Sequence, residues 1–395
     1  MPISSLTVPP PVRRPHRATR PDYELLHSAI ELYEAGKPEE SLARTLAHLF
    51  PDLDVPDLAR EEFSFPQGSS RVSARIEDGM LHVRVPVVKL GPDSLTTAAL
   101  RFVLSRISAS GQLYQPRLRD SAIMLEFSER VTRLHPHKVR EVMRQMPFEA
   151  DANDDWMVAE FRCEPLGREP IEPLTDEEFV RAEHIWRTHW DEVDELVKES
   201  QRKRSRFFLN EVTAYAVHHI GFALPLTGYW WSRISDAGDT FNDADCDPGS
   251  RESALARCCK EMKAVGADSL RDNLGHACYA LSPLDTGTPE ELSNQLGTGD
   301  YLDTIIRMFN AGRYIDSAVA LIGTYNFLLA HYSWPEEIET QLLSGLAQVD
   351  GKPWREATAT LLRHREAMVK AATEDARDDE DGDDDNGDED DEVES

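Results

Sequence analysis

A proline-rich stretch, Glu164–Pro173, divides the chain into two regions with different hydrophobic patterns. Before it, apolar and polar residues alternate in short runs that are typical of strands, as in Met80–Val88. After it, apolar residues recur at intervals of three and four, from Phe179 through Trp186 to Val197, which indicates an amphipathic helix. We therefore predict an α+β N-terminal domain, with an antiparallel sheet and flanking helices, followed by an all-α C-terminal domain.

The N-terminal region has a definite order of expected elements. Two helices are expected at about 23–35 and 38–49, strands at about 72–76 and 80–88, a helix at about 94–108, strands at about 111–118 and 121–127, and a helix at about 137–146. Asp78-Gly79 between the first two strands is a strong signal for a two-residue hairpin turn, because glycine tolerates a positive φ. Strands that are so close in the chain favour antiparallel pairing.

This order, together with SAIMLEF at 121–127 and ADANDDWM at 150–157, resembles the YbjN family and the class I type III secretion chaperones. In those proteins a final strand leads into a helix and then into an Ala-Asp segment with further acids. The resemblance covers about residues 55–160 and rests on a pattern rather than on a diagnostic motif. It implies a sheet that dimerises or binds a peptide, and it implies no reaction.

The strand run at 80–88 is the expected partner-binding element of that sheet. Its apolar residues Met80, Val83, Val85 and Val87 would be exposed or buried in a dimer, and a partner could add a strand or lay a helix against them. A second copy of the chain is one candidate partner, and a protein client of unknown identity is the other.

The chain divides into five expected segments. These are a disordered basic arm at 1–21, the α+β domain with an N-terminal helical hairpin at 22–165, a stiff linker at 166–174, an all-helical domain at 175–372 and a disordered acidic tail at 373–395. Thr175-Asp-Glu-Glu178 is a capping box that would open the first helix of the second domain.

Two stretches far apart in the chain resemble each other. Leu32–Leu42 and Met308–Ala318 share Ala-Gly, a basic residue, an acid and a serine at matching positions. Both look like the turn of a tetratricopeptide-like helical hairpin, near residues 23–49 and 301–330, where glycine permits a tight connection. A continuous array would need about three stacked units, so we expect two isolated hairpins.

Charge is concentrated at the C-terminus. The chain has a formal net charge of −29, and residues 374–395 hold fifteen acids against Arg377, a net of −14. Such a tail would attract basic partners or act only as a solubility brush, and it makes nucleic acid an unfavourable partner. The acids assigned to this electrostatic role are Asp381, Asp383, Asp384, Asp385, Asp388, Glu389, Asp390 and Asp391.

Candidate chemistry is sparse, and we assign no catalytic residues, cofactor or metal. The sequence contains no phosphate-binding loop, no dinucleotide-binding fingerprint and no nucleophile elbow. Cys246, Cys258, Cys259, His276 and Cys278 could suit zinc, but they lack the usual pair spacing. The acids of 243–247 begin like a calcium loop whose sixth position is Pro248 rather than glycine.

Five cysteines, with an adjacent pair at 258–259, suit a reducing compartment. The first twenty residues lack the apolar core of a signal peptide, and the longest apolar stretch, 207–231, contains Glu211 and Pro225, which disfavour a membrane span. The expected location is the cytoplasm. We therefore predict a non-enzymatic chaperone or adaptor of the secretion-chaperone/YbjN type. The alternative is a regulatory or conflict-system effector whose helical domain acts on a nucleotide, a nucleic acid or a metal.

Overall fold

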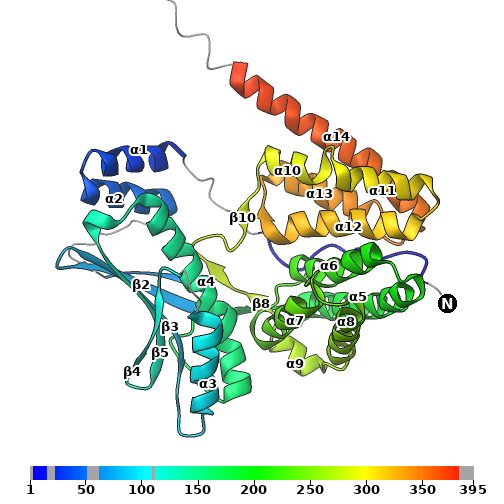
Figure 1. Ribbon diagram of the computed structural model, residues 1–395. Coiled ribbons are helices and arrows are strands. Elements are labelled where there is room, and N and C mark those ends of the chain that lie inside the picture. Colours follow the sequence, from blue (N-terminus) through cyan, green and yellow to red (C-terminus); the bar gives the residue numbers. More distant parts are fainter. Residues whose placement is uncertain (1–2, 16–22, 51–61, 109–111, 382–395) are drawn as a thin grey trace, which may run out of the picture.

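The structure is a computed structural model that describes residues 3–15, 23–50, 62–108 and 112–381. Within them, an antiparallel sheet with flanking helices forms the N-terminal half, and helices form most of the C-terminal half (Figure 1). The predicted fold class is confirmed. None of the helices in these ranges is long and apolar enough to cross a membrane.

The main sheet has seven strands and follows the order β4-β5-β3-β2-β1-β9, with β6 paired to the end of β3. Every pair in it is antiparallel. Its strands are β1 (Phe63–Gly68), β2 (Ser70–Glu77), β3 (Met80–Lys89), β4 (Gln115–Arg119), β5 (Ala122–Arg130), β6 (Glu164–Pro165) and β9 (Cys278–Tyr279).

The hairpin turn predicted at Asp78-Gly79 is confirmed. Glu77 pairs with Met80 across the turn, and both turn residues have positive φ, 52° at Asp78 and 69° at Gly79. A turn with two left-handed residues matches the twist of the strands it joins, and Asp and Gly are the residues that accept this backbone best.

One face of the sheet is covered by helices, and α4 packs along β3 (Figure 1). The N-terminal helices are α1 (Tyr23–Glu34), α2 (Pro38–Leu49), α3 (Thr96–Phe102), which continues as the wider turn η1 (Val103–Ile107), the short η2 (Val131–Arg133), and α4 (Pro136–Phe161). The helix expected to end at Met146 continues to Phe161 because Pro147 is accommodated on its buried face. The segment at 150–157 is therefore part of α4, and its acids lie on that helix.

Helices dominate the C-terminal half. They are α5 (Asp176–Lys203), α6 (Arg206–Ala223), α7 (Gly228–Phe241), α8 (Pro248–Lys263), α9 (Ala267–Arg271), α10 (Pro289–Leu296), α11 (Asp300–Asn310), α12 (Tyr314–His331), α13 (Glu336–Ala347) and α14 (Trp354–Asp381). The Thr175/Glu178 capping box forms in both directions, with Glu178 N donating to Thr175 Oγ1 and Thr175 N to Glu178 Oε2. The apolar stripe predicted for α5 is buried in the helical core.

The segment expected to be a plain linker, 166–174, is bound to both halves. Its strand β7 (Glu172–Pro173) pairs with β8 (Gly275–His276), and Glu169 N donates to Ser69 O at 2.8 Å. A second small pair, β10 (Asp285–Thr286) and β11 (Tyr332–Ser333), lies within the C-terminal half.

The C-terminal half also supplies the last strand of the main sheet, because β9 pairs with the end of β1. The amide of the buried Gln67 extends this pairing beyond the backbone: it accepts from Leu281 N at 3.1 Å and donates to Leu281 O at 2.8 Å. The two halves are thus joined by sheet hydrogen bonds as well as by the chain.

The prediction of a disordered arm is wrong for residues 3–15. This segment, which we call the strap, lies extended against the helical half, and its side chains Leu6, Val8 and Val12 are buried in the helical core. The prolines of the arm and its lack of a helical period suggested disorder, but three apolar side chains, two and four residues apart, dock this extended segment on the helical core.

Backbone hydrogen bonds hold the strap along its length. Thr7 N donates to Glu192 Oε1 and Val8 N to Asp350 Oδ1, both at 2.7 Å. Near its end, the Val12 and Arg13 amides both donate to Ala223 O. An extended segment keeps its backbone polar groups satisfied only through such external partners.

The two stretches with similar sequence form helical hairpins with the same turn. α1 and α2 pack together, as do α11 and α12. Gly36 and Gly312 have φ of 74° and 77°, each donates to the carbonyl three residues before it, and the residue after each donates five residues back. Glycine is favoured here because the helix ends on a left-handed residue. The tetratricopeptide-like assignment itself stays a prediction.

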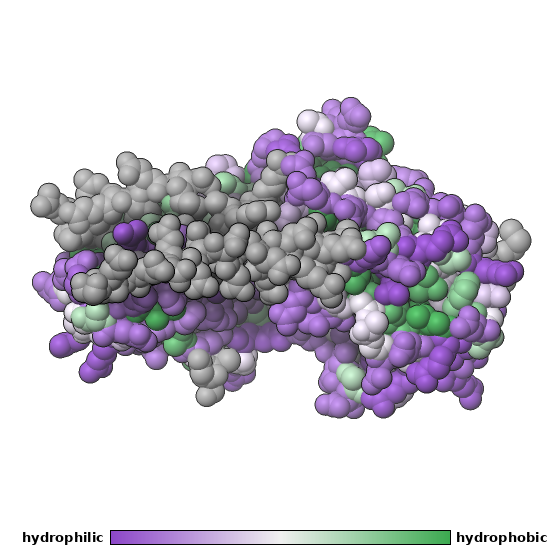
Figure 2. All heavy atoms as spheres, turned by 90° about the horizontal axis from the view of Figure 1, so that it is seen from above, coloured by the Kyte–Doolittle hydropathy of each residue, from purple (hydrophilic) through white to green (hydrophobic). Residues whose placement is uncertain are grey.

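The acidic tail begins inside a helix. α14 extends to Asp381, so residues 373–381 are helical, which corrects the expected boundary of the tail. The seven other acids assigned to the electrostatic role lie outside the described residues. Seen from above, the molecule is mostly hydrophilic, and apolar side chains gather over the C-terminal half (Figure 2).

Candidate functional site

The predicted partner-binding strand lies in the core. β3 is paired on both sides, with β2 and with β5, and the side chains of Val83, Val85 and Val87 are buried. The expectation that these valines are exposed or lie in a dimer interface is therefore wrong, since alternation places them against the helices that cover the sheet within one chain. Met80 is half-buried at the start of the strand.

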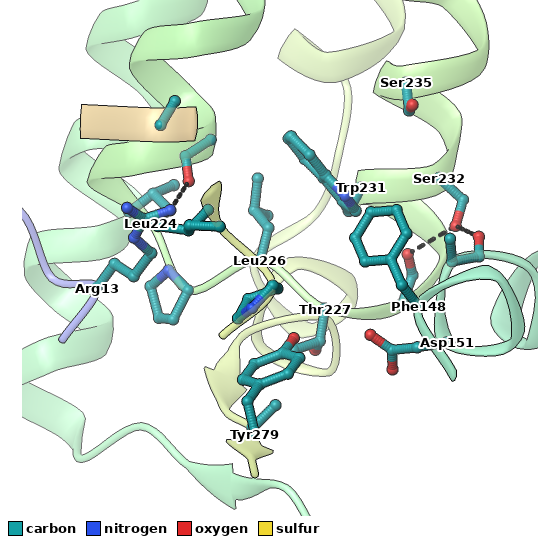
Figure 3. A pocket seen from close by; sticks show the side chains of 18 of the residues that line it. Arg13, Phe148, Asp151, Leu224, Leu226, Thr227, Trp231, Ser232, Ser235 and Tyr279 are labelled. Atoms are coloured by element: carbon teal, nitrogen blue, oxygen red, sulfur yellow. Dashed lines mark hydrogen bonds between the residues drawn. The ribbon is translucent and has the colours of Figure 1, made fainter. Parts of the chain in front are cut away.

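A cleft of about 820 Å³ lies between the two halves. Its walls come from α4, from the C-terminal end of α6, from α7, from the chain around β8 and β9, and from the end of the strap. Figure 3 shows Phe148, Asp151, Trp231 and Tyr279 turned toward a common space. A concave site of this size that collects a few polar groups on apolar walls is the usual form of a binding site.

Three acids of α4 lie at one edge of the cleft, and two of them bind the tip of the β1–β2 hairpin. Asp151, Asp154 and Asp155 lie on one side of the helix because residues three and four apart are neighbours there. Ser69, at the hairpin tip, donates its backbone N–H to Asp151 Oδ1 at 2.5 Å and its hydroxyl to Asp154 Oδ2 at 2.7 Å.

Two glycines permit this close approach. A Cβ on Gly68 would lie 2.3 Å from the Asp151 carboxyl group, and Gly68 has a φ of 63°. A Cβ on Gly228, at the start of α7, would lie 3.0 Å from Asp155 Oδ2, and its φ is 71°. The backbone of each neighbouring loop can therefore lie directly against an α4 carboxylate only where there is no side chain.

The α4 acids differ in their electrostatic surroundings. Asp155 forms an ion pair with Arg168, whose guanidinium also lies 3.6 Å from Asp154. Burial raises the pKa of Asp154 to about 8, with repulsion from Asp155 as the next cause. Burial also raises the pKa of Asp151, which Ser69 only partly offsets. A buried carboxyl group without a full charge partner favours its neutral form.

The strap supplies the two arginines of the cleft wall. Arg13 donates to Gly221 O at 2.9 Å and to Leu329 O at 2.7 Å, and burial lowers its pKa to about 10. Arg14 makes a two-point contact with Glu172, at 2.9 and 3.0 Å. Both guanidinium groups are thus already engaged by the protein, one with helix carbonyls and one with a carboxylate.

A histidine pair lies on the helical side of the cleft. His218 Nδ1 and His331 Nε2 are 3.0 Å apart, so one ring donates and the other accepts. Burial lowers the pKa of His218 to about 3 and also lowers the pKa of His331. Both rings are therefore neutral at pH 7, because a charged ring in this position would be poorly solvated and would repel its neighbour.

The residues weighed as metal ligands stay apart. Cys258 and Cys259 are buried on α8, Cys278 is exposed on β9, and Cys246 donates its thiol to Asp243. No group of three His, Cys, Asp or Glu side chains in the described ranges is placed to hold one metal ion. His276 and Cys278 of that set line the cleft, and His276 Nε2 lies 3.5 Å from Glu178 Oε1.

Sequence patterns did not identify the cleft, because its residues come from several separate parts of the chain. One signal was available: ADANDDWM places three acids within five positions, followed by an aromatic residue. Assigned to a helix, that spacing predicts an acidic face.

Comparison with protein-family models, with curated proteins and with solved structures gives no match. The resemblance to the YbjN family and to class I type III secretion chaperones therefore stays a prediction.

Proposed function

We propose that the protein is a non-enzymatic adaptor or chaperone of the secretion-chaperone/YbjN type that works in the cytoplasm and holds a partner protein in the cleft between its halves. The observation that supports this proposal is the cleft of about 820 Å³, which both halves line. A site at the junction of two packed units can receive a segment that contacts both of them.

The walls of the cleft are built to hold their shape. β9 and the Gln67 amide join the halves, while Arg13 fixes the strap to the helical half and Arg14 fixes it to Glu172 of β7. A preorganised site loses less conformational entropy on binding than one that must first close around its ligand. Val83, Val85 and Val87 were expected to bind the partner, but they are buried in the core of the N-terminal half. We therefore assign partner binding to the cleft instead.

Filling the cleft should block capture of the partner. Ser235 lies on the exposed side of α7 and lines the cleft, so the variant Ser235→Trp would place an indole in the binding space. We expect the partner recovered from the native host to fall at least about tenfold, as for the loss of a binding hot spot. The measurement is quantitative mass spectrometry after affinity purification.

Val180→Trp is the matched control, because Val180 is 66% exposed on α5 and does not line the cleft. It adds the same indole at a surface site and should leave recovery unchanged. Equal recovery of the partner by wild type and by a folded Ser235→Trp variant would contradict binding in the cleft.

A further inference from the structure

We infer that the cleft recognises a cationic group, the guanidinium or ammonium of an arginine or lysine side chain from the partner, which is held by Asp151 and by the aromatic rings of Phe148, Trp231 and Tyr279. The inference rests on the proposed function and names the chemistry of its ligand.

The charge of the cleft lining is the first support. Six carboxylate residues line the cleft against two arginines: Asp151, Asp155, Glu172, Asp239, Asp243 and Asp285 against Arg13 and Arg14. Arg14 is paired with Glu172, and Arg13 keeps its positive charge against helix carbonyls, so acids still outnumber bases in the lining. A surface with this excess of acids favours cations and disfavours anions.

Asp151 is the second support, because it differs from most of the other acids of the lining. Asp155, Asp239 and Asp285 are paired with Arg168, Arg106 and Arg144 in turn. Among the ion pairs of the described residues, none includes Asp151, which is held by Ser69 N and by the Tyr279 hydroxyl.

A cation would therefore give Asp151 the charge partner it lacks. Its pKa is raised mainly by burial, which means that the surroundings favour a neutral carboxyl until positive charge arrives. A guanidinium or ammonium offers several N–H donors, and a carboxylate that already accepts from neutral donors still has lone pairs for it.

The aromatic rings are the third support. Phe148 lies one turn before Asp151 on α4, is 49% exposed, and lines the cleft, as do Trp231 and Tyr279 (Figure 3). Three aromatic side chains that line one cleft form a group rather than a single exposed residue, and the faces of such rings attract cations. Trp231 is held in place by α6, since a Cβ on Gly221 would lie 3.1 Å from its ring.

Peptide binding to the full chain tests this inference. The probes are acetyl-Gly-Arg-Gly-amide, its citrulline analogue, which is nearly isosteric and uncharged, and free agmatine. Calorimetry should show that the arginine peptide binds at least about tenfold more tightly than the citrulline peptide, since a charged donor adds a charge-assisted hydrogen bond. Agmatine that binds as tightly as the arginine peptide would support cation recognition and assign it to small amines rather than to a partner side chain.

Asp151→Asn keeps the acceptor for Ser69 N and removes the charge, so we expect it to lower the affinity for the arginine peptide at least about tenfold. Phe148→Leu removes an aromatic ring with little loss of apolar surface and should lower the affinity for the arginine peptide about threefold. Asp93→Asn is the control, because Asp93 is an exposed acid that does not line the cleft, and it should change affinity less than about twofold. Thermal unfolding verifies that each variant is folded.

Equal affinity for the arginine and citrulline peptides would overturn the inference, and so would undiminished affinity in a folded Asp151→Asn variant. If neither cationic probe binds while Ser235→Trp still abolishes capture of the partner, cation recognition fails and the proposed function stands. If Ser235→Trp leaves capture of the partner intact, the proposed function fails as well.

Discussion

Replacing Leu6 and Val12 of the strap with alanine is expected to lower the free energy of unfolding by roughly 4–6 kcal/mol, because it removes two fully buried apolar side chains. Both residues lie within the first twelve of a chain of 395, and both pack into the helical core. A loss of this size is a large part of the stability of an ordinary domain, so part of the helical half should unfold at moderate temperature. Urea unfolding followed by circular dichroism measures it.

Ser4→Ala is the control for this experiment, since Ser4 is an exposed residue of the same strap and its replacement should leave stability within about 0.5 kcal/mol. A disordered arm would tolerate all of these changes equally. Unfolding curves of the Leu6→Ala, Val12→Ala double variant that superimpose on the wild type would therefore contradict the docked strap.

The second large effect is a loss of stability as the pH rises above neutrality. Three buried carboxyl groups have pKa values raised mainly by burial, to about 8 for Asp154 and to about 7 for Glu192 and Glu211. In the unfolded chain these groups ionise near pH 4, so above that pH the folded state binds more protons than the unfolded state. Stability then falls with rising pH, by about 3 kcal/mol in total between pH 6.5 and 8.

Buried histidines act in the opposite direction at lower pH. The pKa of His218 is lowered to about 3 and that of His219 to about 4, mainly by burial. Both would be protonated in the unfolded chain below pH 6.5, so the stability that their neutral forms provide is lost as the pH falls from there toward 4. Below pH 6.5 the histidines and the carboxyl groups therefore oppose each other, so the fall in stability with rising pH should be shallower between pH 4.5 and 6.5 than between pH 6.5 and 8.

The double variant Glu192→Gln, Glu211→Gln separates these contributions. In each case the new amide oxygen can still accept the hydrogen bond that the carboxylate accepts, from Thr7 N at position 192 and from the Tyr301 hydroxyl at position 211, while the charge is gone. We expect the free energy of unfolding of this variant to fall about half as much between pH 6.5 and 8 as that of the wild type. A wild-type stability that is flat or rising across this range would contradict the assignment.

Local sequence signals correctly predicted the elements that depend on residues close together in the chain. The Asp78-Gly79 hairpin, the Thr175 cap and the α5 stripe depend on residues close in the chain, and all three form as expected. The end of α4 was missed because proline usually stops a helix, whereas here the helix packs on the sheet on both sides of Pro147. Tertiary packing outweighed a local preference.

The strap and the cleft depend on long-range contacts, which a single sequence does not reveal. Val12 meets Ala223 more than two hundred residues away, and the partner of Gln67 is Leu281. For β3, the alternating valines correctly predicted that one face of the strand is apolar. The pattern alone could not show whether that face binds a partner protein or, as the structure shows, packs against α4.

Site-specific photo-cross-linking tests the central claim, that the partner occupies the cleft between the halves, most directly. A benzophenone side chain would replace Phe148 in the cleft and, in a second protein, Val180 on the exposed surface of α5. In the native host, we predict one discrete cross-linked partner from position 148 and none from position 180. Discrete cross-links from position 180 alone, with none from position 148, would contradict the claim.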